Sequence, residues 1–163
     1  MSSRRLSTLV PALAIVAAAL ILGAWSWHDR TIAVTHGVIG STYIDNGATG
    51  PSVGDVRLFQ IATAPAKGGA GRMDAVMTTT GPAAADGSEI RMAQLIFTFG
   101  NEADQIVVTG AGVYPAAGSV LAENTTTVRP ITGGSGIYSG AHGWCESIHY
   151  ADGTWRHIFH LER

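Results

Sequence analysis

A run of thirteen residues near the C-terminal end places the strongest limit on the fold of this chain. Residues 131–143 read Ile-Thr-Gly-Gly-Ser-Gly-Ile-Tyr-Ser-Gly-Ala-His-Gly, with five glycines in the run. Apolar or aromatic residues stand between the glycines, and segments rich in β-branched and aromatic residues lie on both sides, which is unlike a flexible linker. Glycine adopts positive φ without a steric penalty. The run therefore predicts tight backbone turns that join β-strands.

Composition limits the class of protein. A chain of 163 residues has room for one domain and a short appendage. Charged residues make up 13% and apolar types 46%, which predicts a packed core. The net charge is −2 and Lys67 is the only lysine, so we expect no nucleic-acid partner. Cys145 is the only cysteine, so an internal disulfide is excluded.

The N-terminal segment has the composition of a membrane-targeting sequence. Arg4 and Arg5 precede an uncharged, apolar stretch over residues 6–27. Basic residues before such a stretch favour a cytoplasmic start, with the following domain carried across the membrane. We expect residues 1–30 to form an uncleaved, single-pass signal anchor with the folded domain outside the cytoplasm. The alternative is a cleaved signal peptide and a secreted domain.

Residues 31–163 are predicted to form one all-β domain, because short alternating segments are separated by turn residues throughout. Seven or eight such strands indicate a barrel or a sandwich, and periodicity alone does not choose between them. The predicted strands are 31–44, 55–63, 72–80, 90–99, 106–110, 125–132, 143–150 and 154–161.

The last two strands predict a polar pair on an apolar face. Asp152-Gly153 is a typical two-residue type I′ loop, and that loop would pair Ile148 with His157. One face would then contain Trp144, Glu146, Ile148, Tyr150, Trp155, His157, Phe159 and Leu161. This face is nearly all large and apolar, so we expect it to face the core or a ligand cavity.

Glu146 and His157 interrupt that face and would be diagonal neighbours. A carboxylate and an imidazole on an apolar wall are candidates for acid–base catalysis. They would equally serve as a structural ion pair or hydrogen bond, and both interpretations stay open here. In the same register Cys145 would lie opposite His160, with His149 on the same face. No Cys-x-x-Cys or His-Glu-x-x-His spacing is present, so we predict neither a metal nor a cofactor.

The glycine run resembles the Ile-Thr-Gly-Gly-x-Gly run of the allene oxide cyclase barrel-like family, which is related to the plant dirigent proteins. Gly54-Asp55 followed by Phe59 and the closing residues 156–161 are similar to the same family, and the likeness covers roughly residues 37–161. The resemblance implies a bacterial-type exported member. Its fold would be an eight-stranded antiparallel β-barrel, here preceded by an N-terminal apolar helix. Members of the family often assemble as dimers or trimers, so a homo-oligomer is compatible with the resemblance.

In this family the lumen holds a small hydrophobic molecule and acts mainly by shape and proximity. We therefore expect an exported barrel that binds such a molecule and steers its cyclisation in a dirigent-like manner. One alternative is a cyclase or isomerase of unknown substrate, and another is a non-catalytic module whose lumen its own side chains fill. Ile61 and Met77 stand where the plant cyclases carry polar groups. The predicted wall residues are Phe59, Ile61, Met77, Leu95, Phe97, Tyr138, Trp144 and Phe159.

Overall fold

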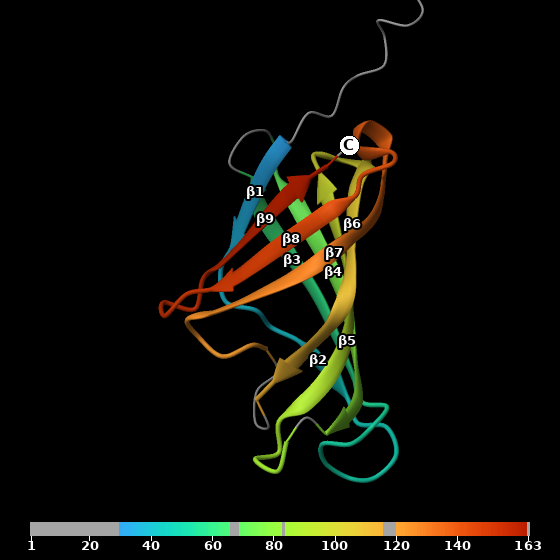
Figure 1. Cartoon of the computed structure of the whole chain (residues 1–163), viewed down its shortest axis with the longest axis vertical. Coiled ribbons are helices and arrows are strands. Elements are labelled where there is room, and N and C mark those ends of the chain that lie inside the picture. Colours follow the sequence, from blue (N-terminus) through green and yellow to red (C-terminus); the bar gives the residue numbers. More distant parts are fainter. Residues whose placement is uncertain (1–29, 66–68, 83, 116–119, 163) are drawn as a thin grey trace, which may run out of the picture.

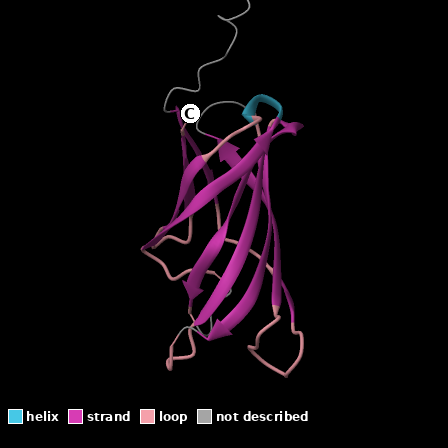
Figure 2. Cartoon of the chain, turned by 45° about the vertical axis from the view of Figure 1, so that its right-hand side comes forward, coloured by secondary structure: helices cyan, strands magenta, loops and turns pink. Residues whose placement is uncertain are grey.

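The computed structural model describes residues 30–65, 69–82, 84–115 and 120–162. Almost all of them lie in strands or in the loops that join strands, as Figure 2 shows. Within these ranges no helix has the length and hydropathy needed to cross a bilayer. The predicted apolar helix of the N-terminal segment falls outside the described residues, so the choice between anchor and signal peptide stays a prediction.

The strands run in chain order around a single sheet (Figure 1). They are β1 (Arg30–His36), β2 (Thr42–Ile44), β3 (Val56–Pro65), β4 (Gly71–Pro82), β5 (Glu89–Phe99), β6 (Asn101–Tyr114), β7 (Thr125–Ser135), β8 (Gly143–His149) and β9 (Trp155–Leu161). A 3₁₀ turn, η1, spans Gly136–Tyr138.

The sheet closes on itself, and every pairing in it is antiparallel. β1 pairs with β9 along its whole length and also with β3, through Val34–Pro65 and Thr35–Ala64. The short β2 continues along the same edge of β3. The ring of β1 and β3 to β9 is therefore an eight-stranded barrel, which confirms the predicted fold class. The predicted first strand, 31–44, is instead divided into β1 and β2 by a linking segment from which Ile39 packs against the core.

The wall of the barrel splits between β6 and β7. Their ladder runs from Gln105–Ser135 to Val108–Ile131 and stops there, although both strands continue. The next residue of β7 is Pro130, which has no N–H with which to continue a ladder. β7 stays paired with β8 over residues 125–131. Residues 109–114 of β6 are consequently paired only with β5.

The glycine run makes the predicted tight turns. β7 extends into the run as far as Ser135, and the chain then turns through η1. Gly136 and Gly143 have φ of +59° and +124°, values that side chains with a Cβ rarely adopt. The backbone also passes closely here: a Cβ at Gly143 would lie 2.0 Å from the carbonyl oxygen of His160. The turn thus requires glycine for both conformation and space.

The last hairpin differs from its prediction by one residue. Tyr150 N–H donates to Thr154 O, Gly153 N–H donates to Tyr150 O, and Gly153 has φ of +79°. This is a three-residue loop with a bulge at glycine, in place of the predicted two-residue loop. Ser147 therefore pairs with His157. A shift of one residue exchanges the faces of a strand, so Cys145, Ser147 and His149 of β8 point inward.

Aromatic side chains fill the barrel near the end where η1 lies. Phe159 and Phe97 meet edge to face, with ring centroids 4.8 Å apart. Phe99 contacts both Phe159 and Tyr138. Such contacts stabilise beyond the area they bury, so this end of the lumen is a packed core.

Replacing Gly143 tests how far the close approach of β8 and β9 depends on glycine. We expect Gly143→Ala to lower the free energy of unfolding by more than about 3 kcal/mol, because the new Cβ meets backbone atoms. Gly140→Ala is the matched control: Gly140 has φ of +79° with open space around it, so only the conformational cost of about 1–2 kcal/mol applies. Urea denaturation of the full chain measures both, and equal losses would contradict the prediction.

Candidate functional site

A small cavity lies inside the barrel below the aromatic core. Its volume is about 20 Å³, which holds roughly one water molecule. Side chains therefore fill most of the lumen in this structure. The cavity is lined by Ile39, Phe59, Met73, Met77, Leu95, Tyr114, Val120, Leu121, Arg129, Ser147, Trp155 and His157. The wall is mostly apolar, and the polar groups come from β6, β7, β8 and β9.

The predicted wall residues occupy three kinds of place. Phe59, Met77 and Leu95 line the cavity. A second group belongs to the core that adjoins it: Ile61, Phe97, Tyr138 and Phe159. Trp144 lies on the outer face, 36% exposed and stacked on His160 with ring centroids 4.7 Å apart. The one-residue shift in β8 is the reason that Trp144 points away from the lumen.

Glu146 and His157 do not meet, so the predicted pairing of these two residues is wrong. His157 points into the lumen and is buried, whereas Glu146 lies on the outer face, where its Oε1 is 3.2 Å from His160 Nε2. The outward position of Glu146 follows from the same shift in register. His160 is likewise directed away from Cys145 and His149, so these three do not converge.

His157 instead belongs to a buried chain of hydrogen bonds with His36 and Ser147. His157 Nε2 is 3.0 Å from His36 Nε2, and His157 Nδ1 is 2.9 Å from Ser147 Oγ. His36 Nδ1 is 2.7 Å from the carbonyl oxygen of Gly37. These contacts join β1, β9 and β8, which are neighbouring strands of the sheet. We call this chain, Ser147–His157–His36, the imidazole relay.

The acceptor at one end sets the direction of the relay. Because a carbonyl oxygen only accepts, His36 Nδ1 carries the proton and its Nε2 must accept. His157 Nε2–H therefore donates to His36, and Ser147 Oγ–H donates to His157 Nδ1. Burial, with the charges of His36 and Arg129 adding to it, lowers the pKa of His157 to about 3. Burial is also the main reason that the pKa of His36 is lowered.

Two neutral imidazoles in this arrangement are suited to orienting Ser147 and are poorly suited to removing a proton from a substrate. A base whose pKa is about 3 binds a proton poorly near neutral pH. Ser147 Oγ donates to His157 and keeps lone pairs that are able to accept from a molecule in the cavity. Cys145 on the same strand adds no nucleophile, because burial raises the pKa of its thiol to about 12.

The sequence did not single out three of the polar residues that line the cavity, namely Tyr114, Ser147 and Arg129 of β7. Arg129 is 3% exposed, and its Nη2 donates to Tyr114 Oη at 2.7 Å while Nη1 donates to Thr127 Oγ1. Its Nε has no hydrogen-bond partner among the described residues. Alternation places Arg129 on the same face of β7 as Ile131, and both are buried. Val128 lies on the opposite face and is 60% exposed, although valine usually points inward, so the sequence did not show which face of β7 is the inner one.

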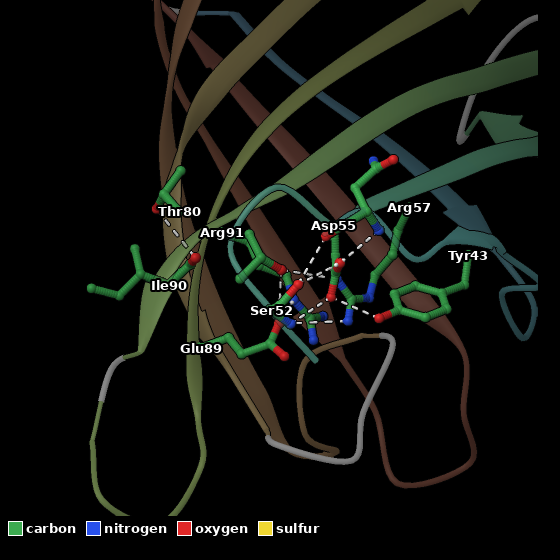
Figure 3. Close-up of polar contacts among 10 residues, drawn as sticks. Tyr43, Ser52, Asp55, Arg57, Thr80, Glu89, Ile90 and Arg91 are labelled. Carbon is green, nitrogen blue, oxygen red and sulfur yellow. Dashed lines mark hydrogen bonds and ion pairs between the residues drawn. The ribbon is translucent and has the colours of Figure 1, made fainter. Parts of the chain in front are cut away.

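The lumen is also polar at the end opposite η1, where Figure 3 shows the contacts. Glu89 Oε2 accepts from Arg91 Nε at 2.8 Å and from Thr79 Oγ1 at 2.9 Å, and it lies 3.5 Å from Arg57 Nη2. Arg91 in turn stacks over the ring of Tyr114, 4.7 Å from its centroid. This charged cluster therefore reaches the cavity through Tyr114.

A loop carboxylate lies beside that cluster. Asp55 accepts from Tyr43 Oη and from the backbone N–H of Ser52, both at 2.7 Å (Figure 3). The Tyr43 contact, followed by that with Ser52, lowers the pKa of Asp55 to about 2. Asp55 is thereby committed to shaping its loop.

No family model matches the chain, and no curated protein matches it in sequence. Solved structures share the fold, and three of them follow. A pyocyanin demethylase has a TM-score of 0.62 at 18% identity, with 82% of this chain and all of that chain covered. A nonspecific heme-binding cyclase that catalyses a [4+2] cycloaddition during neoabyssomicin biosynthesis has a TM-score of 0.60 at 14% identity over all of this chain and 81% of that one. The Diels-Alderase AbmU from Streptomyces koyangensis has a TM-score of 0.58 at 16% identity, covering 96% and 84%.

At these identities the likeness establishes the barrel fold and leaves the function to be argued from the site. None of the three structures carries the allene oxide cyclase or dirigent name, so that family name stays a prediction from the glycine run. The described residues contain no group of three or more His, Cys, Asp or Glu placed to hold a metal ion.

The relay makes stability depend on pH in a defined direction. The pKa of His157 is lowered from 6.5 to about 3, so the unfolded chain binds more protons between these values. The contribution of neutral His157 to the free energy of unfolding is therefore fully present above pH 6.5 and is lost as the pH falls toward 3. Between pH 7.5 and 4.5 we expect the chain to lose about 2–3 kcal/mol more than His157→Gln does, measured by urea denaturation.

His160→Gln, on the outer face of the same strand, leaves the relay intact and serves as the control. It should lose as much stability as the unaltered chain. Parallel pH profiles for the unaltered chain and His157→Gln would show that His157 is not held neutral by the fold.

Proposed function

We propose that the barrel binds a small hydrophobic molecule in its lumen and steers the cyclisation of that molecule. The observation that carries this proposal is the enclosed apolar cavity, on which a guanidinium, a phenol, a hydroxyl and an imidazole converge. Ligand sites characteristically combine an apolar wall with a few oriented polar groups. Two of the solved structures named above are described as a cyclase and a Diels-Alderase, which supports a ring-closing reaction.

The side chains present suit catalysis by confinement. The apolar wall would hold a flexible molecule in one folded conformation, which is how proximity lowers the barrier to ring closure. Ser147 and Arg129 would orient its polar atoms, and the relay would hold Ser147 in place. This division of roles needs neither a strong base nor a nucleophile among the lumen residues.

Entry of a molecule larger than water requires part of the wall to move. The part best placed to move is the cover formed by Val120 and Leu121, which lies between the diverging ends of β6 and β7. Leu121 is held by apolar contacts with Tyr114 and Trp155 and by one hydrogen bond, from His149 Nδ1 to its carbonyl oxygen at 2.9 Å. We infer that a ligand enters by displacing this cover.

The small volume of the cavity favours the second candidate function, a structural barrel filled by its own side chains. A structural barrel would populate only the state in which side chains fill the lumen, whereas a ligand-binding barrel would also populate a state in which the cover is open. If the cover opens, the measured affinity is reduced by the fraction of molecules that are open. A variant with a weaker cover then binds more tightly.

Binding of N-phenyl-1-naphthylamine, a neutral lipophilic fluorophore, by the full chain tests the proposal. We expect Leu121→Ala to lower its Kd at least about tenfold, because truncating a buried leucine removes contacts that hold the cover shut. Leu58→Ala, which truncates an outward leucine of β3, is the matched control and should leave Kd unchanged. Absence of binding by both the unaltered chain and Leu121→Ala would reject the ligand-binding function in favour of the filled barrel.

Export of the domain and its attachment to the membrane remain part of the same proposal. They rest on the basic and apolar order of the N-terminal sequence.

A further inference from the structure

We propose that Arg129 is an anchor for an acidic oxygen, so that the ligand of the lumen is an amphipathic molecule with a carboxylate, enolate or phenolate at one end. This inference rests on the proposed ligand-binding function and names the class of molecule. It begins from the fact that Arg129 is a buried cation that lines the cavity.

Arg129 makes no ion pair in the described part of the chain. The carboxylates of the lumen end pair with other groups: Glu89 through Oε2 with Arg57 and Arg91, and Asp55 with its own loop and Tyr43. The partners of Arg129 are two neutral hydroxyls, those of Thr127 and Tyr114. A guanidinium stays protonated in proteins. Burying such a charge without a negative partner is costly, and an anionic ligand would offset that cost.

One nitrogen of this guanidinium, Nε, is buried and has no hydrogen-bond partner at all among the described residues. Buried N–H groups are nearly always satisfied, so an orphan beside a cavity indicates an acceptor that binds there. Bonds between a guanidinium and an oxyanion are among the strongest that such a donor makes.

The fold seats the side chain of Arg129 in a specific way. It lies against Gly110 and Gly112 of β6: a Cβ at Gly110 would be 3.2 Å from Arg129 Cγ, and one at Gly112 would be 2.8 Å from Nη2. These glycines stand where the β6–β7 ladder has ended. The phenol of Tyr114, two residues further, then holds Nη2. Gly110, Gly112 and Tyr114, three alternate residues of β6, thus hold the side chain of Arg129 in one position, as expected of a preorganised binding site.

The remainder of the cavity defines the other end of the ligand. Phe59, Met77 and Leu95 line the same cavity as Arg129, and its described lining has no second unpaired charge. An apolar body therefore suits the wall and an acidic oxygen suits Arg129. A neutral hydrocarbon would leave Nε unsatisfied, and a small inorganic anion would leave the apolar wall unfilled.

Matched ligands test the inference. Decanoate and decanol have the same chain length and differ in the head group, so the ratio of their Kd values isolates the acidic oxygen. Each is measured at pH 8 by displacement of N-phenyl-1-naphthylamine from the full chain. We expect decanoate to bind at least tenfold more tightly than decanol. In Arg129→Met the ratio should fall to about one while the Kd of decanol changes little.

Two further variants keep the result interpretable. Arg156→Gln removes an exposed arginine from the outer face of β9 and should preserve the tenfold ratio. Tyr114→Phe removes the hydroxyl that holds Nη2 and should reduce the ratio at least threefold. It serves as the test if circular dichroism shows that Arg129→Met does not fold.

The outcomes separate this inference from the function on which it rests. Failure of the full chain and of Leu121→Ala to bind either ligand would reject the proposed function. Equal binding of decanoate and decanol would leave that function standing and overturn the role of Arg129. A preference for decanoate that survives both Arg129→Met and Tyr114→Phe would also overturn it, because another cation would then be responsible.

Discussion

Two backbone pairings between β1 and β3 turn this sheet into a barrel, and the interior follows from that closure. Once the sheet is closed, every second residue of each strand projects into a lumen whose width is fixed by the number of strands. Such a lumen must be filled, and its polar groups must find partners within it. The aromatic core, the imidazole relay and the charged cluster at the far end are three ways of meeting this requirement within one lumen.

The polar part of the lumen consists of two hydrogen-bonded networks and of Arg129, which borders the cavity. In the relay each imidazole accepts from one neighbour and donates to the next, so that two histidines are buried without charge. At the far end one carboxylate serves two arginines. Arg129 contacts the charged cluster through Tyr114, and its Nε has no hydrogen-bond partner among the described residues. A position where local satisfaction fails beside a cavity is where function is expected to reside.

Alternation along single strands was predictable from the sequence, and relations between strands were not. The inward side of β3 and β5 was predicted correctly, because Phe59, Leu95 and Phe97 fall on one parity with few exceptions. The face of β8 was wrong because Asp152-Gly153 fits two loop types that differ by one residue. Arg129 was missed because Val128 points outward, against the usual preference. The partnership of His36 with His157 depends on the pairing of β1 with β9, two strands far apart in the sequence, which no local pattern encodes.

The seat of Arg129 has a consequence for how this protein can change over evolution. A Cβ at position 110 or 112 would crowd the arginine, lying 3.2 Å from its Cγ or 2.8 Å from its Nη2, whereas loss of the arginine would remove that constraint on both glycines. The three positions are therefore expected to covary across relatives: lineages that retain the arginine keep both glycines, and lineages that lose it are free to place side chains there. Such a pattern would mark the descendants that inherited the same chemistry inside a barrel otherwise tolerant of substitution.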